Sequence, residues 1–317
     1  MEKARFKWVL RERNRKIAAK TEVFTEQQAR RVRSFHSSFK EYSPTPLIEL
    51  TSLAQHLGIK NLFVKDESYR FELNAFKVLG GSFAIGSYIA NELGEDIDDL
   101  PYMRLVSDEV RSLLGSKTFI TTTDGNHGRG VAWTANRLKQ QAIVYMPQGS
   151  AAERLANIRA EGAQAEITDM NYDDTVRYTS ELAQKNGWII VQDTAWDGYT
   201  RIPLWIMQGY MTMALEAYEQ LPVKPTHIFL QAGVGSLAGS VQGFFADIYG
   251  SSCPLTFIVE PKGADCLYQT AAANDGSLHS VTGRLETIMA GLACGEPNSI
   301  AWEILGNLSD GFISCPD

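Results

Sequence analysis

Short runs of apolar and β-branched residues alternate with longer helix-like segments along most of this chain. The runs lie at 62–65, 118–122, 142–146, 165–168, 188–192, 227–231 and 256–260. Most are continuously apolar, as expected for strands covered on both faces. The helix-like segments lie between them, at 74–93, 126–139, 151–161, 173–186, 202–220 and 236–249. Three of these segments are followed by a glycine (Gly162, Gly187 and Gly250), the residue favoured for a left-handed helix cap.

This order of elements predicts an α/β fold with parallel sheets and helices on both faces. We expect two open-sheet domains that interleave, because no linker, repeat or low-complexity segment divides the chain. The large domain would comprise residues 35–117 and 222–317, the small domain residues 118–221, and residues 1–34 would form a basic extension. In such sheets ligands bind beyond the carboxyl ends of the strands, so residues that directly follow a strand are the first candidates for a site.

Composition indicates a globular protein, since 44% of the 317 residues are hydrophobic and 21% are charged. The net charge of −7 argues against a general nucleic-acid binder. Residues 1–40 nevertheless carry 12 Lys and Arg against 4 Asp and Glu. We expect this basic start to be a solvated helix or frayed extension; contact with an anionic partner or a neighbouring subunit is the alternative.

The cellular location and the metal content that we expect are both inferred from features that the sequence lacks. No apolar run is long enough to span a bilayer, and the first 20 residues are too charged for a secretory signal. The four cysteines and five histidines show no metal-type spacing. We therefore expect a cytoplasmic protein that has no structural metal and no membrane partner.

Lys77 is the first residue that indicates chemistry. It lies in the first turn of a predicted helix with Asn74 as its N-cap, and its neighbours on the same face are Gly80, Gly81 and Ala84. This strip of small residues suggests room for a flat, bulky group. The positive end of the helix dipole would favour loss of the lysine proton, as Schiff-base formation requires. An ordinary surface lysine is the alternative.

The segment 233–239 indicates a phosphate site, because a glycine-rich turn from a strand into a helix directs N–H groups at one point. Its residues Gly233, Val234, Gly235, Ser236, Leu237 and Ala238 also fit the dinucleotide pattern G-x-G-x-x-G/A, and Glu260 follows where a ribose-binding acid would lie. An NAD-dependent oxidoreductase is therefore an alternative. It assigns no role to Lys77.

Two acids follow predicted strands. Asp124 lies in the turn Thr123-Asp124-Gly125-Asn126-His127, and Asp193 follows the run 188–192. The turn could hold a carboxylate through its backbone N–H groups, and an acid there is useful if the ligand also carries a cation or if a proton must move. Each acid alone is equally consistent with a turn or cap residue. Together they would form an acidic pocket for an amine.

In combination, the motifs Asn74-Ala75-Phe76-Lys77, Thr123-Asp124-Gly125-Asn126-His127 and Gly233-Val234-Gly235-Ser236-Leu237-Ala238 resemble, in order, those of fold-type II pyridoxal-phosphate (PLP) enzymes. Within that group the chain is similar to the diaminopropionate ammonia-lyases, through stretches at 42–47, 169–175, 192–196, 205–210 and 289–297. The resemblance implies a PLP enzyme that converts 2,3-diaminopropionate to pyruvate and ammonia by α,β-elimination.

The resemblance also implies roles for the residues of these motifs. Lys77, next to Phe76, would bind PLP as a Schiff base and then act as the base at Cα. Asn126 would contact the ring hydroxyl, and residues 233–238 would hold the phosphate. Asp124 and Asp193 would handle the second amine and the proton transfers, with Asp124 as the base for the D-isomer. Thr123, Gly125 and His127 would receive the substrate carboxylate.

Some features depart from the family pattern or stay open. Relatives continue beyond the equivalent of Asp317 into a segment that completes the large domain and supplies a Ser or Thr to the pyridine nitrogen, so the large domain is expected to be incomplete here. A serine/threonine-type dehydratase and a truncated non-catalytic homologue are the alternative functions. The family resemblance suggests a homodimer. Cys266 and Cys294 could approach each other near the site, as buried thiols or as a redox-sensitive pair.

Overall fold

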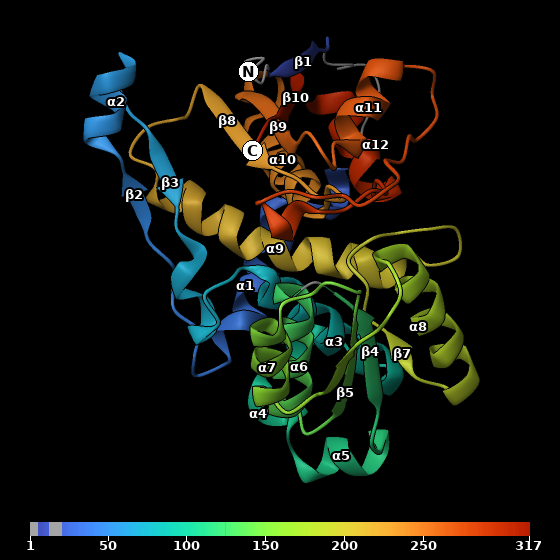
Figure 1. The fold of residues 1–317 in the computed structure, drawn as a ribbon. Helices are drawn as coiled ribbons and strands as arrows, with labels where there is room; N and C mark the ends of the chain where they lie inside the picture. Colours follow the sequence, from blue (N-terminus) through green and yellow to red (C-terminus); the bar gives the residue numbers. More distant parts are fainter. Residues whose placement is uncertain (1–5, 13–20, 124) are drawn as a thin grey trace.

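Two four-stranded sheets lie at opposite ends of the molecule, and the long helix α9 (Arg201–Gln220) crosses between them (Figure 1). The computed structural model describes residues 6–12, 21–123 and 125–317. The chain starts in one sheet with residues 7–10, forms the whole of the other sheet between residues 118 and 190, and then returns to the sheet in which it started. The predicted interleaving is therefore seen in the path of the chain, whereas the domain boundaries themselves stay a prediction.

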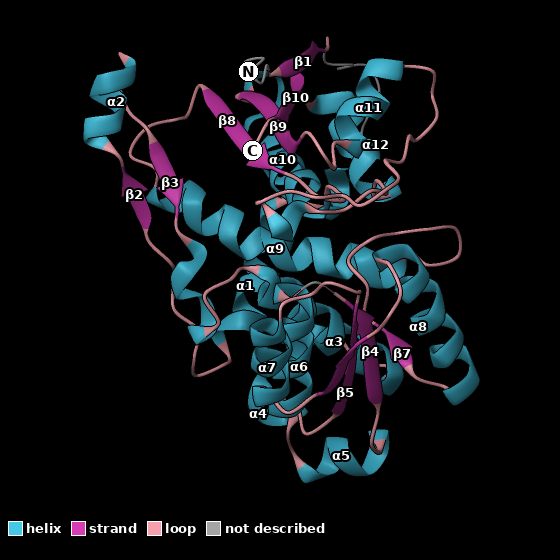
Figure 2. Ribbon diagram, in the orientation of Figure 1, coloured by secondary structure: helices cyan, strands magenta, loops and turns pink. Residues whose placement is uncertain are grey.

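The first sheet has the order β6-β5-β4-β7 and is parallel throughout. Helices cover both of its faces, with α6 and α7 on one side and α8 on the other (Figure 2). Its elements are β4 (Thr118–Thr122), α6 (Asn126–Arg137), β5 (Gln141–Met146), α7 (Ala152–Ala160), β6 (Gln164–Ile167), α8 (Tyr172–Asn186) and β7 (Ile189–Ile190). Apart from β7, these match the predicted elements closely, and Gly162 and Gly187 have the expected positive φ.

The strand order creates a switch point between β4 and β7. From β4 the chain moves outward through β5 and β6, then returns to pair β7 with the other edge of β4. Loops that leave neighbouring strands in opposite directions open a crevice at the carboxyl end of the sheet. The loops after β4 and β7 carry the two predicted motifs of this region.

β7 is shorter than the predicted strand because the Gln192 side chain replaces its next main-chain bonds to β4, accepting from the N–H of Thr122 at 3.1 Å and donating to the carbonyl of Thr122 at 3.0 Å. Tyr199 bonds to the other edge of β7. The Tyr199 hydroxyl donates to the carbonyl of Ile190 at 3.0 Å and accepts from the N–H of Gln192 at 2.8 Å. A side chain thus replaces the next strand partner. The chain can therefore bend directly before Asp193.

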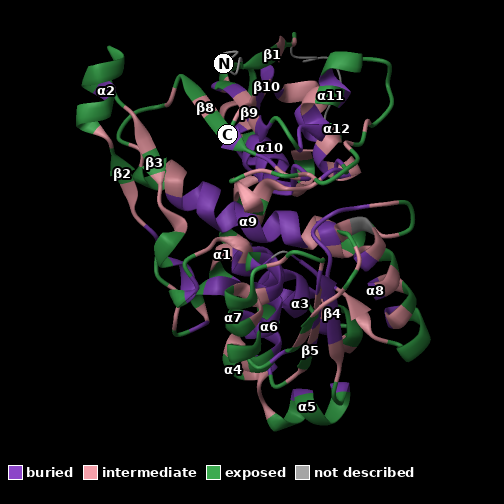
Figure 3. Cartoon of the chain, in the orientation of Figure 1, coloured by how far each residue is buried: buried purple, intermediate pink, exposed green. Residues whose placement is uncertain are grey.

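The second sheet has the order β1-β10-β9-β8, and only β1 is antiparallel. Its elements are β1 (Lys7–Leu10), β8 (His227–Gln231), α10 (Ser236–Tyr249), β9 (Leu255–Pro261), α11 (Cys266–Ala273), α12 (Ser299–Leu308) and β10 (Gly311–Cys315). Leu230 and Phe312 are buried on the face beneath α10 and α12. On the opposite face Phe229 and Trp8 are 61% and 65% exposed. Figure 3 accordingly shows β1 and β8 mostly in the colour of exposed residues.

The interpretation of the basic start as a solvated helix or frayed extension is wrong for the part of it that the structure describes, while the bound of the extension at residue 34 stays a prediction. Residues 7–10 form a strand of the second sheet, and α1 (Glu26–Ser37) packs on α9. Arg30 and Arg33 both pair with Glu219 of α9. Part of the basic charge is thus used to dock α1.

A hairpin with a short helix projects from the body beside β8 (Figure 1). It consists of β2 (Leu47–Glu49), α2 (Thr51–Leu57) and β3 (Phe63–Lys65), with the strands antiparallel. At its base, Arg70 and Lys65 both donate to Glu216 of α9. The first of these ion pairs is buried and fixes the projection to the body.

The core between the sheets is formed by α1, α3 (Lys77–Leu93), α6 and α9, with α4 (Tyr102–Leu105) and α5 (Asp108–Leu114) following α3. Glycines allow α3 and α9 to approach closely. A Cβ at Gly209 would clash with the carbonyl oxygen of Leu79, and one at Gly80 would lie 2.7 Å from Ile206 and Tyr210. This packing fixes the start of α3, and with it Lys77.

Candidate active site

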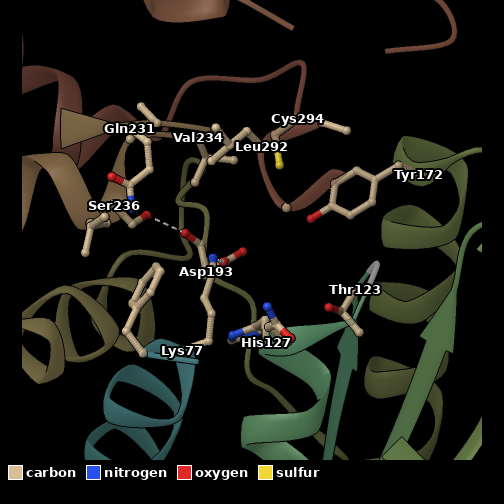
Figure 4. A pocket seen from close by; sticks show the side chains of 18 of the residues that line it. Lys77, Thr123, His127, Tyr172, Asp193, Gln231, Val234, Ser236, Leu292 and Cys294 are labelled. Atoms are coloured by element: carbon tan, nitrogen blue, oxygen red, sulfur yellow. Dashed lines mark hydrogen bonds and ion pairs between the residues drawn. The ribbon is translucent and has the colours of Figure 1, made fainter. Parts of the chain in front are cut away.

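A cavity of about 200 Å³ lies where the carboxyl ends of β4, β7 and β8 face the start of α3 (Figure 4). Elements from both halves of the molecule line it. Its wall includes most of the predicted site residues: Phe76, Lys77, Thr123, Asn126, His127, Asp193, Gly233, Val234, Gly235, Ser236 and Leu237. Strand ends far apart in the sequence thus meet at one point, as the α/β pattern predicted.

Lys77 is the first residue of α3, and Phe76 rather than Asn74 is the residue before the helix. The prediction of Asn74 as the N-cap is wrong, because Asn74 has a φ of +58° and lies in the preceding turn. The Lys77 amine extends into the cavity (Figure 4) and donates to a carboxylate oxygen of Asp193.

Electrostatics make this contact an ion pair. Burial alone would lower the pKa of Lys77, but the Asp193 carboxylate outweighs burial and raises it. Burial would likewise raise the pKa of Asp193, yet the charge of Lys77, helped by His127, lowers it to about 2. The prediction that the helix N-terminus favours loss of the Lys77 proton therefore does not hold in this arrangement. Its proton is held until the carboxylate is moved or neutralised.

The glycines next to Lys77 serve helix packing rather than a flat ligand. Gly80 faces Ile206 and Tyr210 of α9, and Gly81 faces the backbone of α6 at Gly130. Neither lines the cavity. The sequence interpretation of this strip as room for a bulky group is wrong, because a row of small residues on a helix equally well admits another helix.

The loop after β4 forms a small turn before α6. The hydroxyl oxygen of Thr123 accepts from the N–H of Gly125 at 3.0 Å, and the ring nitrogen Nε2 of His127 contacts the carbonyl of Val191 at 2.7 Å. The first contact uses the N–H of Gly125, and the first N–H groups of α6, which begins at Asn126, have no partner within the helix. Asp124 lies outside the described residues.

The glycine-rich loop after β8 has the geometry of an anion cradle. Gly235 has a φ of +100° and directly precedes α10, whose first N–H groups have no partner within the helix. A Cβ at Gly233 would lie 3.2 Å from the sulfur of Cys294, so the loop backbone has neighbours at close range. Leu237 and Ala238 are buried in the first turn of α10. The helix dipole adds to the attraction for phosphate.

Glu260 does not have the role that a dinucleotide site requires. It is fully buried and accepts the N–H groups of Leu267 and Tyr268, at 2.9 and 2.7 Å, at the start of α11. Burial raises the pKa of Glu260 to about 8 in spite of these bonds. A side chain that caps a buried helix cannot also bind a ribose, which argues against the NAD alternative.

Cys266 and Cys294 both lie beside Gly233, as the sequence suggested. The Cys266 thiol is 3.7 Å from the carbonyl oxygen of Gly233 and 3.7 Å from Glu260. Burial raises the pKa of the Cys266 thiol, and the charge of Glu260 adds to this. Cys266 is therefore a neutral, weakly donating thiol beneath the cradle.

Sequence reasoning missed several residues of the cavity wall. Tyr172 opens α8 and its hydroxyl accepts from Gln192 at 2.8 Å; Gln192 also donates to the carbonyl of Thr122. Arg154 and Leu292 reach the same wall from α7 and from the short 3-10 helix Ala290–Leu292. None of these follows a strand, so the rule that found the other residues could not find them.

Among the described residues, no group of three or more His, Cys, Asp or Glu side chains is arranged to hold a metal ion. Nor does any helix in the described part combine the length and apolar character needed to cross a membrane.

The described residues fit PLP. A lysine amine and an anion cradle face the same cavity, and Asn126 lies on its wall. The hydroxyl of Tyr210 is buried near Lys77 and has no hydrogen-bond partner in the described part of the chain. The phosphate, the ring hydroxyl and the aldehyde of PLP thus each have a suitable protein group: the anion cradle, Asn126 and Lys77, respectively.

Comparisons with known proteins agree with this geometry. Residues 39–317 match the family described as "Pyridoxal-phosphate dependent enzyme". Diaminopropionate ammonia-lyase of Salmonella typhimurium is 53% identical over 290 residues, which cover 90% of this chain and 72% of the relative.

Crystal structures of diaminopropionate ammonia lyase from Escherichia coli, as the holoenzyme and in complex with D-serine, each superpose with a TM-score of 0.90 at 49% identity. In both cases the match covers 99% of this chain and 77% of the solved one. The predicted fold-type II architecture is confirmed. The chain belongs to the pyridoxal-phosphate dependent enzymes, in the diaminopropionate ammonia-lyase family.

Proposed function

We propose that this protein catalyses the PLP-dependent α,β-elimination of 2,3-diaminopropionate to pyruvate and ammonia. The observation that carries the proposal is the pairing of Lys77 with Asp193 inside a cavity that also contains an anion cradle. A lysine that can hold the cofactor thus lies next to an acid that can attract an amine. The family relationship supports the same assignment.

The bound cofactor would be contacted by both halves of the molecule. The loop 233–238 and the first N–H groups of α10 would hold the phosphate, and Asn126 would contact the ring hydroxyl. Phe76 lines the cavity next to Lys77, with its ring 5.1 Å from that of Tyr210. Thr123, His127 and the N-terminus of α6 would receive the substrate carboxylate.

When bound, the cofactor takes up the electron pair left at the substrate Cα, which makes loss of the β-amine possible. Lys77 would hold the cofactor and then move the Cα proton. Asp193, ionised because its pKa is lowered, would favour a substrate whose second amine is cationic. From the family resemblance, Asp124 would be the base for the D-isomer.

The substrate class is a small amino acid with an amine on Cβ. A hydroxyamino acid offers no cation to Asp193, so the serine/threonine-type dehydratase is the weaker assignment. The homodimer and the cytoplasmic location rest on the family resemblance and on the sequence, and both stay predictions.

The test is the visible spectrum of the purified chain with added PLP, followed by a pyruvate assay. We expect an absorbance band that Lys77→Ala abolishes, and a loss of pyruvate production of about a thousandfold or more in that variant. Lys117→Ala is the control, because Lys117 is also partly exposed and ion-paired but lies far from the cavity.

A panel of serine, threonine and both isomers of diaminopropionate separates the two lyase assignments. Turnover of the hydroxyamino acids at a higher rate would favour the dehydratase. Absence of both the band and the activity would overturn the proposal and would favour the non-catalytic homologue.

A further inference from the structure

The main chain of Asp193 is tied to the start of α10. The Ser236 hydroxyl donates to the carbonyl oxygen of Asp193 at 2.5 Å (Figure 4). Asp193 follows β7 of the first sheet, and Ser236 follows β8 of the second. This hydrogen bond therefore connects the anion cradle to the acid that pairs with Lys77, across the two halves of the molecule.

Asn298 fixes the direction of that bond. Its side-chain nitrogen donates to the Ser236 oxygen at 2.8 Å, while its side-chain oxygen accepts from the N–H groups of Ile300 and Ala301 at 2.9 and 3.3 Å. The two N–H donors settle which end of the amide is oxygen. Because an amide nitrogen can only donate, the Ser236 oxygen must accept there, and its own proton points to Asp193.

The connection is buried and anchored on the cradle. Asn298 is 0% exposed and Ser236 3% exposed, and the Asn298 N–H donates to the carbonyl of Val234 at 2.8 Å. Asn298 thus holds the glycine-rich loop through its main chain and the Ser236 hydroxyl through its side chain. Neither contact can exchange readily with water.

We propose that Asn298 and Ser236 are positioning residues that set the placement of Asp193 against Lys77. This inference rests on the proposed function and deepens it. The Ser236 hydroxyl already donates its proton to the main-chain carbonyl of Asp193. The phosphate would therefore be held by main-chain N–H groups and not by this hydroxyl. When a bound phosphate fixes the geometry of the anion cradle, the cradle therefore also orients Asp193.

Ser236→Ala tests the proposal, with Ser240→Ala as the matched control. Ser240 lies one turn further along α10, is equally buried, and donates to the carbonyl of Met207 at 2.6 Å. We expect kcat with diaminopropionate to fall about tenfold or more in Ser236→Ala, because the carbonyl of Asp193 loses its partner. The dissociation constant for PLP should stay within about twofold, and Ser240→Ala should change neither quantity comparably.

A pair of variants at Asn298 separates positioning from helix capping. Asn298→Asp keeps an oxygen for the N–H groups of Ile300 and Ala301 but accepts a proton from Ser236, which turns that hydroxyl away from Asp193. Asn298→Ala loses the cap but leaves the hydroxyl directed at Asp193. If Asn298 positions Asp193, kcat should be lower in Asn298→Asp than in Asn298→Ala. If Asn298 only caps α12, both the stability and kcat should be lower in Asn298→Ala.

The outcomes are distinct. If Ser236→Ala weakens PLP binding with kcat unchanged, the hydroxyl serves the phosphate and the inference is wrong. If Ser236→Ala and Ser240→Ala behave alike, the contact is only structural and the inference also fails. An inactive parent chain would overturn the proposed function first. If the Asn298 variants do not fold, the serine pair still decides.

Discussion

Glu216 accepts a hydrogen bond from Arg70 at each of its two carboxylate oxygens, at 2.9 and 2.7 Å, although neither side chain reaches solvent. Arg70 also donates to Glu67, and Lys65 donates to Glu216. Burial alone would lower the pKa of Arg70, but the two acids outweigh burial and raise it. The projecting hairpin is thus held to α9 by charges that are almost fully removed from water.

We expect Arg70→Ala to lower the free energy of unfolding by about 3–5 kcal/mol, because it leaves buried carboxylates without their main partner. Urea unfolding followed by circular dichroism measures this. Arg284→Ala is the control, since its ion pair with Glu286 is exposed and should contribute less than about 0.5 kcal/mol. Equal effects of the two changes would contradict the role given to the buried pair.

Gly80→Ala and Gly81→Ala should have opposite effects although the two residues are adjacent on α3. A Cβ at Gly80 would lie 2.7 Å from Ile206 and Tyr210, so we expect a loss of about 1–3 kcal/mol from overpacking. A Cβ at Gly81 would meet its neighbours at 3.5 Å, an ordinary contact, and alanine would gain up to about 1 kcal/mol of helix propensity. Melting temperatures of the two variants would show the sign directly.

Asp193→Asn should change how stability depends on acid. The folded pKa of Asp193 is lowered to about 2 from 3.8, so its ionised form stabilises the fold above pH 3.8 and this contribution is lost as the pH falls to 2. The raised pKa of Lys77 matters only at the alkaline end. We expect the gap in stability between parent and variant to shrink by about 2 kcal/mol between pH 5 and pH 2. Urea midpoints across this range measure the gap, and a constant gap would show that the ion pair does not form.

Glu260→Gln should alter the neutral range instead. The folded pKa of Glu260 is raised from 4.5 to about 8, chiefly by burial, so the fold binds a proton that the unfolded chain has released between these values. Stability of the parent should therefore fall as the pH rises from 4.5 to 8. The variant has no such proton, and its thermal unfolding should depend less on pH over this range. A parallel dependence in the two proteins would argue against a protonated Glu260.

The strands and loops that form the cavity could be predicted because each carries a strong local pattern. Thr118–Thr122 and His227–Gln231 are found at the predicted bounds, and the motifs that follow them line the cavity. Parallel strands place their carboxyl ends together, so the position after a strand was sufficient to select Asp193 and Gly233.

Other features depend on contacts with residues far away in the sequence, which no local sequence pattern identifies. Leu47–Glu49 is too short for alternation to show, and Lys7–Leu10 pairs with a strand at the other end of the sequence. The role of Gly80 depends on which helix lies opposite. Tyr172 reaches the cavity through the direction of α8, and the bond from Asn298 to Ser236 depends on how α12 meets α10.

The pairing of β1 with β10 has a consequence for the order in which the protein folds on the ribosome. Lys7 lies opposite Ser314, so β1 can pair only after the whole stretch of chain between these residues has been synthesised. The sheet formed by β4 to β7, in contrast, comes from one continuous stretch and can fold while synthesis proceeds. Val9, which packs against the core in the folded protein, therefore stays exposed until β10 has been synthesised, and closure of the second sheet is a long-range step that we expect to be slow.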